Sequence, residues 1–389
     1  MTLADVVILV VLVAALVAGL RAGLFAGLGW LCGLIAGGAA APWVTPLVND
    51  AIPDPGWRGL AVVGTTIGLL ALGAAVGGAI GSVVRRGADR MRLRVVERLL
   101  GGALGAVAAA LALSLAGSGI AAAGIPGVSA SVASSAVLRT IDRLTPAPVA
   151  EALARLHSTV LEDTLPTIGG LFEAGTTPDT AEIDTDDPDL AASAASVARI
   201  TGVAYACGTS SSGSGFVAAD DLVITNAHVV AGVDVPVVEL PGEPAREGRV
   251  VYFDPVDDLA AIAVDVDAAP LAIVETLSAG SAAAVQGYPY GGPFRTVPAG
   301  VLAVGSARVA DIYESARAPR EVYTLSAEVV PGNSGGPLLT ESGEVAGVVF
   351  ARDEARADVG YAMTANELMP VFAVIGDAPE PVSTGTCIG

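Results

Sequence analysis

The residues best suited to covalent chemistry surround Ser334, in the segment Pro331-Gly-Asn-Ser-Gly-Gly-Pro337. A serine hydroxyl is a weak nucleophile until a base takes its proton and hydrogen-bond donors stabilise the oxyanion that forms. The glycines let the backbone turn sharply, so that the N–H groups of Gly332 and Ser334 can converge on one oxygen. The segment therefore predicts nucleophilic catalysis by Ser334, with Gly332 and Ser334 forming an oxyanion hole.

Only two histidines are available as the base, His157 and His228, and both precede Ser334. The motif also fits the nucleophile turn of an α/β-hydrolase, but in that fold the histidine follows the serine, so this fold is excluded. His228 lies in Val223-Ile-Thr-Asn-Ala-His-Val-Val230, where a predicted strand runs into a turn. His157 lies in a predicted amphipathic helix, and we interpret it as an ordinary surface or partly buried residue. His228 is therefore the predicted base.

The third member must accept a hydrogen bond from the imidazole and stabilise its charged form. Asp254, Asp257 and Asp258 are the candidates between His228 and Ser334. We choose Asp258 because it directly precedes an apolar strand that can hold its carboxylate in place. Asp257 would point the other way in an extended chain. The resulting order of His, Asp and Ser along the chain is that of the chymotrypsin-like proteases.

From about residue 199 the sequence consists of short β-type runs separated by Gly, Pro, Asp and Ser, which indicates an all-β barrel or sandwich. Together with the three candidate residues, the motifs Ser214-Gly-Phe216, Asp258-Leu-Ala-Ala-Ile262 and Gly347-Val-Val349 resemble the trypsin-like serine proteases, in particular their HtrA-like branch. The resemblance implies a chymotrypsin-like double β-barrel with the triad between two perpendicular six-stranded barrels. It also implies peptide-bond hydrolysis through an acyl-enzyme, with no cofactor and no metal.

The same resemblance suggests where a substrate side chain binds. The residue six before the nucleophile often lies at the base of the S1 pocket in these enzymes, and here it is Glu328. An acidic base would favour basic side chains, although Glu328 also fits an ordinary surface acid. The segment that begins at Gly360 is expected to form part of the pocket wall.

The first 125 residues have a different character from the rest. They contain 8 Arg and 5 Asp+Glu (net +3), whereas residues 126–389 contain 12 Arg and 35 Asp+Glu (net −23), which together give the total of −20. A charge of −23 disfavours nucleic-acid binding, which needs basic patches. The whole chain is 53% apolar and only 15% charged, which is unusual for a fully soluble protein and indicates a membrane part joined to a soluble one.

Four long uncharged stretches predict transmembrane helices near 3–20, 23–45, 60–84 and 99–121, since about 20 residues cross the hydrocarbon core. A cleavable signal peptide is disfavoured because the first stretch lacks a basic start and three more spans follow. Arginines concentrate in the loops after the first and third spans, so the positive-inside rule places both termini outside the cytoplasm. We therefore expect a multi-pass protein of the cell membrane, in contact with the lipid bilayer, with everything after residue 125 on the extracytoplasmic side.

Glycines recur four residues apart in the second and third spans, which lets helix backbones approach closely: Gly29, Gly33 and Gly37, then Gly73, Gly77 and Gly81. The spans carry no interior ionisable residue, which favours an anchor over a channel. The motifs Asp5-Val-Val-Ile-Leu-Val10, Gly19-Leu-Arg-Ala-Gly23 and Leu99-Leu-Gly-Gly102 resemble the colicin V production protein (CvpA) family.

An anchor of this kind joined to a protease is similar to the membrane-anchored serine proteases of actinobacteria. That resemblance implies protein or peptide substrates in the periplasm or cell-wall space, and a role in envelope stress or acid resistance. Two alternatives stay open. The first is a membrane export or signalling module with the protease fold as its regulatory or scaffold domain, and the second is a catalytically idle protease fold.

Between the two parts, residues 126–198 are expected to form an extracytoplasmic connector with a helix near 147–163 and an acidic linker. Such a linker is a plausible site of nicking or self-cleavage. Residues 199–389 form the predicted protease domain. By resemblance to the same family, Cys207 and Cys387 are expected to form a disulfide on the oxidising side of the membrane. Cys32, inside a span, is interpreted as an apolar filler.

Overall fold

The computed structural model describes residues 3–52, 55–88, 94–122, 128–161, 165–170, 182–204, 209–374 and 380–388. The chain divides into two compact units, Met1–Val160 and Leu161–Gly389. Each is described by itself. The segment expected as a connector, 126–198, is divided between them: the part up to Val160 belongs to the first unit and the part from Leu161 to the second.

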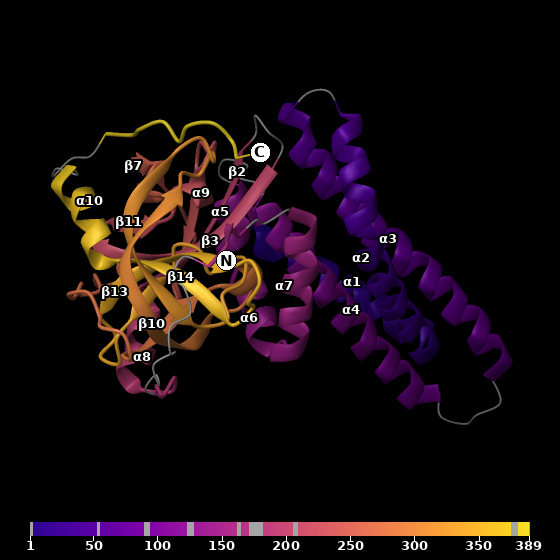
Figure 1. Cartoon of the computed structure of the whole chain (residues 1–389). Coiled ribbons are helices and arrows are strands. Elements are labelled where there is room, and N and C mark those ends of the chain that lie inside the picture. The colour runs from indigo at the N-terminus through magenta and orange to yellow at the C-terminus, as the bar shows by residue number, and fades with distance from the viewer. Residues whose placement is uncertain are drawn as a thin grey trace. The chain divides into compact units, whose positions relative to one another are not determined.

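The first unit is built from helices (Figure 1). Four of them are long and apolar: α1 (Leu3–Ala22), α2 (Leu24–Ala51), α3 (Pro55–Ala88) and α4 (Arg94–Ala122). All four are long and apolar enough to cross a membrane, over Ala4–Ala22, Leu24–Asn49, Leu60–Val83 and Val95–Ala121. Each helix extends beyond the uncharged stretch that predicted it, since a helix continues into charged residues as long as its backbone hydrogen bonds continue.

Three shorter helices complete this unit: α5 (Val128–Ala133), α6 (Ala136–Leu144) and α7 (Ala147–Leu161). Asp5, early in α1, is 1% exposed and accepts hydrogen bonds from the Ser135 hydroxyl at 2.7 Å and the Val137 N–H at 3.2 Å. Ser135 is itself the N-cap of α6 and accepts from the Leu138 N–H. The one acidic residue of the first helix is therefore a buried cap for a later helix.

The second unit consists of two seven-stranded sheets (Figure 1). The first has the order β6-β5-β2-β3-β4-β8-β7. Its strands are β2 (Val197–Ala204), β3 (Thr209–Ala219), β4 (Leu222–Thr225), β5 (Val237–Glu239), β6 (Arg246–Glu247), β7 (Arg249–Asp254) and β8 (Leu259–Ala263). A short helix, α9 (Ala227–Val230), follows β4.

The second sheet closes on itself, because β13 pairs with both β12 and β14. Six strands form this barrel: β9 (Ala282–Gly287), β10 (Arg295–Ala310), β11 (Arg317–Ser326), β12 (Pro337–Leu339), β13 (Val345–Asp353) and β14 (Val359–Thr364). A seventh strand, β1 (Thr167–Ile168), comes from the expected connector and pairs in parallel with β13. The expected double-barrel architecture is thus confirmed, with an additional strand that the sequence did not predict.

Short helical elements flank the sheets. The acidic segment is partly helical: Asp187 caps α8 (Pro188–Ser193) by accepting from the Asp189 N–H at 2.8 Å, and η1 (Ala194–Ser196) leads into β2. η2 (Pro289–Gly291) joins β9 to β10. The C-terminal helix expected from Thr364 is present as η3 (Ala365–Leu368) and α10 (Met369–Val374).

The closest helix pair of the first unit depends on glycine. A Cβ added to Gly33 of α2 would overlap the carbonyl oxygen of Gly73 of α3, and a Cβ on Gly29 would overlap that of Gly77. Gly64, also in α3, has no atom within 4 Å of an added Cβ. The four-residue spacing of the glycines therefore corresponds to a backbone-to-backbone contact, as small residues allow between membrane helices.

We expect Gly33→Leu to separate α2 from α3 and to destabilise the detergent-solubilised protein by roughly 1–3 kcal/mol, the usual cost of overpacking a close contact. Thermal unfolding followed by circular dichroism measures this as a lower midpoint for the helical unit. Gly64→Leu is the matched control and should leave the midpoint unchanged. Equal midpoints for the two variants would contradict the close contact.

Candidate active site

The turn that carries Ser334 requires glycine on both sides. Ser334 is 3% exposed, and Gly332 and Gly335 have φ angles of +91° and +80°, which L side chains rarely adopt. A Cβ on Gly332 would overlap the carbonyl oxygen of Tyr288, and a Cβ on Gly335 would overlap that of Ser214. The glycines of the sequence motif are therefore steric requirements of the turn.

Hydrogen bonds hold the carbonyl groups of this turn away from the site. The Ser214 hydroxyl donates to the carbonyl oxygen of Gly332 at 2.7 Å, and the Ser214 N–H donates to that of Ser334, also at 2.7 Å. The Tyr290 N–H donates to the carbonyl oxygen of Pro331 at 2.6 Å. Among the residues that the structure describes, the N–H groups of Gly332 and Ser334 donate no hydrogen bond. Both are available to a ligand oxygen, as an oxyanion hole requires.

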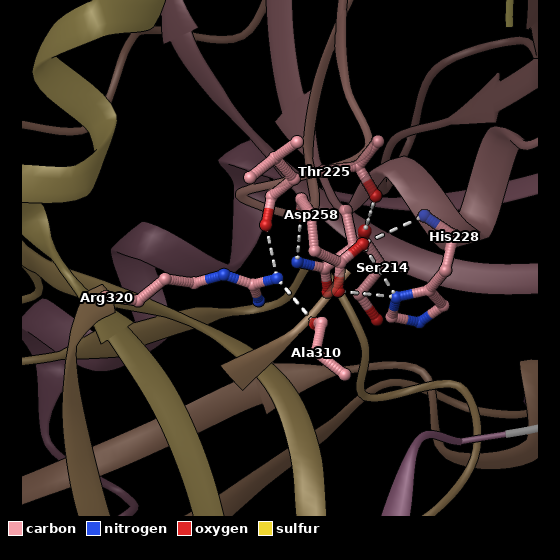
Figure 2. Close-up of polar contacts among 8 residues, drawn as sticks. Ser214, Thr225, His228, Asp258, Ala310 and Arg320 are labelled. Carbon is pink, nitrogen blue, oxygen red and sulfur yellow. Dashed lines mark hydrogen bonds and ion pairs between the residues drawn. The ribbon is translucent and has the colours of Figure 1, made fainter. Parts of the chain in front are cut away.

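His228 and Asp258 lie at the same end of two neighbouring strands of the first sheet, because the end of β4 pairs with the start of β8. His228 lies on α9, after β4, and Asp258 lies in the turn between β7 and β8. The imidazole Nδ1 is 2.8 Å from Oδ2 and 3.0 Å from Oδ1 of Asp258, and the His228 N–H donates to Oδ1 at 2.9 Å (Figure 2). The side chains are 7% and 4% exposed. This pair is therefore a buried, two-point contact.

The contact fixes which imidazole nitrogen is free. A carboxylate only accepts hydrogen bonds, so the Asp258 side chain assigns the proton to Nδ1 and leaves the lone pair on Nε2. Nε2 is buried and has no hydrogen-bond partner within the described part of the chain. A base with this geometry can take a proton from a hydroxyl brought to Nε2.

Ser334 and His228 open into one cavity of about 1370 Å³. Asp258 and Gly332 line the same cavity, as does Arg320 of β11. The structure thus places the predicted nucleophile, base, acid and oxyanion glycine around one space. Catalytic hydrogen bonds in unliganded sites are often longer than in the complex with substrate, so a free Nε2 is compatible with a role as base.

The two neighbouring aspartates have other partners. Asp254 caps its own turn by accepting from the N–H groups of Val256 at 2.8 Å and Asp257 at 3.1 Å. Burial raises the pKa of Asp257, as does repulsion from Asp254, while Arg320 partly opposes this shift. Among the described residues, Asp258 is the one of the three candidates that is hydrogen-bonded to His228.

Sequence analysis missed Arg320, which is 1% exposed and reaches the acid turn from the other sheet. Its Nη2 donates to the carbonyl oxygens of Val256 and, at 2.8 Å, Ala310 (Figure 2). Burial lowers the pKa of Arg320, while the nearby carboxylates of Asp258 and Asp257 raise it. No local motif marks this arginine, because its partners lie on a turn far away in the sequence.

The two candidate S1 residues occupy different environments. Glu328 is exposed and is not among the residues that line the cavity. Gly360 is buried on β14, where a Cβ would overlap a methyl group of Val329. Val329 therefore packs against Gly360, while Glu328, its neighbour in the chain, lies at the surface.

The sequence also pointed to one further histidine and three cysteines. His157 belongs to α7, which is in the other compact unit. Cys32 is free and exposed on α2. Cys387 lines the cavity, whereas Cys207 lies outside the described residues. The described residues contain no cluster of His, Cys, Asp and Glu that could hold a metal ion.

Comparison with known families agrees with this geometry in both units. Residues 213–348 match the trypsin-like peptidase domain, and residues 4–146 match the colicin V production protein family. The chain is similar to serine protease Rv3671c of Mycobacterium tuberculosis, with 35% identity over 271 residues that cover 68% of this chain and 67% of the relative. The putative serine protease HhoB of Synechocystis is 34% identical over 39% of this chain and 37% of its own length.

Among solved structures, the protease of M. tuberculosis Rv3671c in its active form is similar to the second unit. It is 36% identical, with a TM-score of 0.53, and the match covers 57% of this chain and 100% of that structure.

We expect Asp258→Asn to lower kcat by about 10⁴-fold, because an amide cannot hold the imidazole in the tautomer with a free Nε2. Hydrolysis of labelled casein by the full-length protein in detergent measures the change. Asp257→Asn is the matched control, since it removes a neighbouring carboxylate without a contact to His228. Equal activities for the two variants would exclude Asp258 as the third member.

Proposed function

This chain belongs to the trypsin-like serine proteases that carry a colicin V production region at the N-terminus, and from that premise we propose that it is a membrane-tethered endopeptidase. His228 is the general base, Asp258 orients it, and Ser334 is the nucleophile. The observation that carries the assignment is the buried Nδ1–carboxylate contact beside Ser334 in one cavity.

The proposed reaction follows from these positions. The Ser334 Oγ attacks the scissile carbonyl carbon while His228 Nε2 takes the hydroxyl proton. The N–H groups of Gly332 and Ser334 hold the oxyanion of the tetrahedral intermediate. His228 then gives its proton to the leaving amine, and an acyl-enzyme remains. Water activated by the same imidazole hydrolyses that ester and returns Ser334 to its hydroxyl form.

Specificity depends on the pocket behind Ser334. From the resemblance to trypsin-like proteases we propose that the segment beginning at Gly360 forms part of its wall; a Cβ on Gly360 would overlap Val329. Glu328 is kept as a candidate at the pocket's outer surface, where it would attract basic side chains. We also propose self-cleavage within residues 126–198, which the exposed acidic residues before α8 support.

Proteins and peptides outside the cytoplasm are the proposed substrates, in a periplasm-like or cell-wall space during envelope stress or acid exposure. The arginine-rich loops support this side of the membrane. Asp353, at the end of β13, is a carboxylate that stays ionised in moderate acid. Burial alone would raise its pKa, but hydrogen bonds from Arg356, Tyr361 and the backbone lower the pKa to about 2.

Labelling of Ser334 by a serine-directed fluorophosphonate tests the chemistry. We expect the full-length protein to be labelled and Ser334→Ala to be unlabelled, since only an activated serine reacts with this probe. Labelling of the alanine variant, or none of the wild type, would support a catalytically idle protease fold.

The match of residues 4–146 to the colicin V production family favours a second candidate, a membrane export or signalling module that uses the protease fold as a scaffold. Growth of a deletion strain in acid separates the two. Rescue by the wild type and not by Ser334→Ala is the outcome expected for the protease, whereas rescue by both would favour the membrane module.

We further propose a Cys207–Cys387 disulfide on the outer side. Of the cysteines described, Cys387 is bonded and Cys32 is free. Intact cells treated with a membrane-impermeant maleimide should be labelled on this protein only after reduction. Cys207→Ser should expose Cys387 and make labelling independent of reduction. Labelling confined to broken cells would place the protease in the cytoplasm, and labelling of the wild type before reduction would exclude the disulfide.

A further inference from the structure

A segment of this chain lies in the cavity that contains the proposed nucleophile. Residues 165–170 line the cavity together with His228 and Ser334. Their strand β1 runs parallel to β13. The segment precedes the first barrel in sequence, so it is not one of the strands that build either barrel.

Backbone hydrogen bonds hold the segment. The Arg352 N–H donates to the carbonyl oxygen of Pro166 at 3.1 Å, and the Glu354 N–H donates to that of Ile168, also at 3.1 Å. In the same ladder Thr167 pairs with Arg352 and Ile168 with Asp353. The pairing is therefore short, at two residues of each strand.

The segment occupies the edge of β13 that also holds the turn carrying Ser334. The Gly335 N–H donates to the carbonyl oxygen of Val349 at 2.8 Å, and the Val349 N–H donates to that of Gly336 at 2.9 Å, so this edge of β13 holds the nucleophile turn. β14 pairs with the opposite edge as far as Arg352. The segment thus takes the next N–H groups along the same edge, beyond the nucleophile turn.

Two apolar side chains anchor the segment: Ile168 is partly buried against an apolar core cluster, and Leu165 is buried more deeply. Leu165 is 8% exposed and belongs to an apolar cluster with Ala327, Val329 and Val349. Thr167, two residues later, is exposed. Val349 is the residue bonded to the turn that carries Ser334, so Leu165 is buried against a residue next to the proposed reaction site.

We infer that residues 165–169 are an intramolecular inhibitor that occupies the binding edge for extended substrates. The inference rests on the proposed protease function and adds a regulatory site to it. An extended peptide that reaches Ser334 must pair with a free strand edge, and β-strand addition to such an edge supplies backbone hydrogen bonds regardless of sequence. Substrate therefore binds only to the fraction of molecules in which the segment has left.

Competition of this kind changes KM and leaves kcat unaltered, because the apparent dissociation constant is the intrinsic one divided by the competent fraction. Leu165→Asp removes the more deeply buried of the two anchors. In the full-length protein in detergent we expect it to lower KM for fluorescein-labelled casein by roughly tenfold, which corresponds to about 1.4 kcal/mol. Met369→Asp, an exposed apolar residue at the start of α10 that does not line the cavity, is the control and should leave KM unchanged. Fluorophosphonate labelling of Ser334 should be the same in all three proteins.

A second measurement does not depend on activity. In the Ser334→Ala background, amide hydrogen exchange at Arg352 and Glu354 should be slow and should become faster when Leu165→Asp is added. Unchanged KM together with unchanged exchange would overturn the inference, and so would cleavage inside residues 165–169 by the wild type, which would make the segment a substrate. If the wild type is not labelled at Ser334, the proposed protease function is excluded instead. The exchange rates would still show whether residues 165–169 occupy the edge of β13.

Discussion

The contact between the His228 imidazole and the Asp258 carboxylate is the interaction on which the site depends, and it is made from an unfavourable backbone conformation. Asp258 has φ of +57°, which costs a residue other than glycine on the order of 1–3 kcal/mol. Its carboxylate accepts from both the N–H and the Nδ1 of His228, and its carbonyl oxygen accepts from the Asn226 amide at 2.9 Å. These three hydrogen bonds, to Asn226 and His228 just after β4, therefore offset the strain and fix the direction of Nε2.

Each sheet of the second unit also positions a residue that the other sheet supplies. Ser214, on β3 of the first sheet, holds the carbonyl groups of the turn that presents Ser334 from the second sheet. Arg320, on β11 of the second sheet, holds the turn that presents Asp258 from the first sheet. Because each sheet makes one of these contacts to the other, neither Ser334 nor Asp258 is held in place by its own sheet alone. The geometry of the site therefore depends on how the two sheets pack against each other.

The sequence predicted those parts of the site that are local or ordered along the chain. The glycines around Ser334 specify a turn by themselves, and the position of both histidines before the serine excluded the α/β-hydrolase fold. Arg320 could not be found in this way, because its partner Val256 lies 64 residues away and is contacted through a backbone carbonyl that carries no side-chain signal. β1 could not be found either, since a two-residue strand has no hydrophobic period and pairs with a strand at the far end of the chain.

Two acidic groups of the second unit, Asp353 and Asp257, respond to pH in opposite directions. The lowered pKa of Asp353 means that its contribution to stability is complete above the unfolded value of 3.8 and is lost only as pH falls toward about 2. Burial raises the pKa of Asp257, so its ionised form costs stability at higher pH and its protonation relieves repulsion from Asp254 as pH falls. As pH falls toward about 2, protonation of Asp353 therefore removes stability at the end of β13, whereas protonation of Asp257 relieves repulsion beside the turn that carries Asp258.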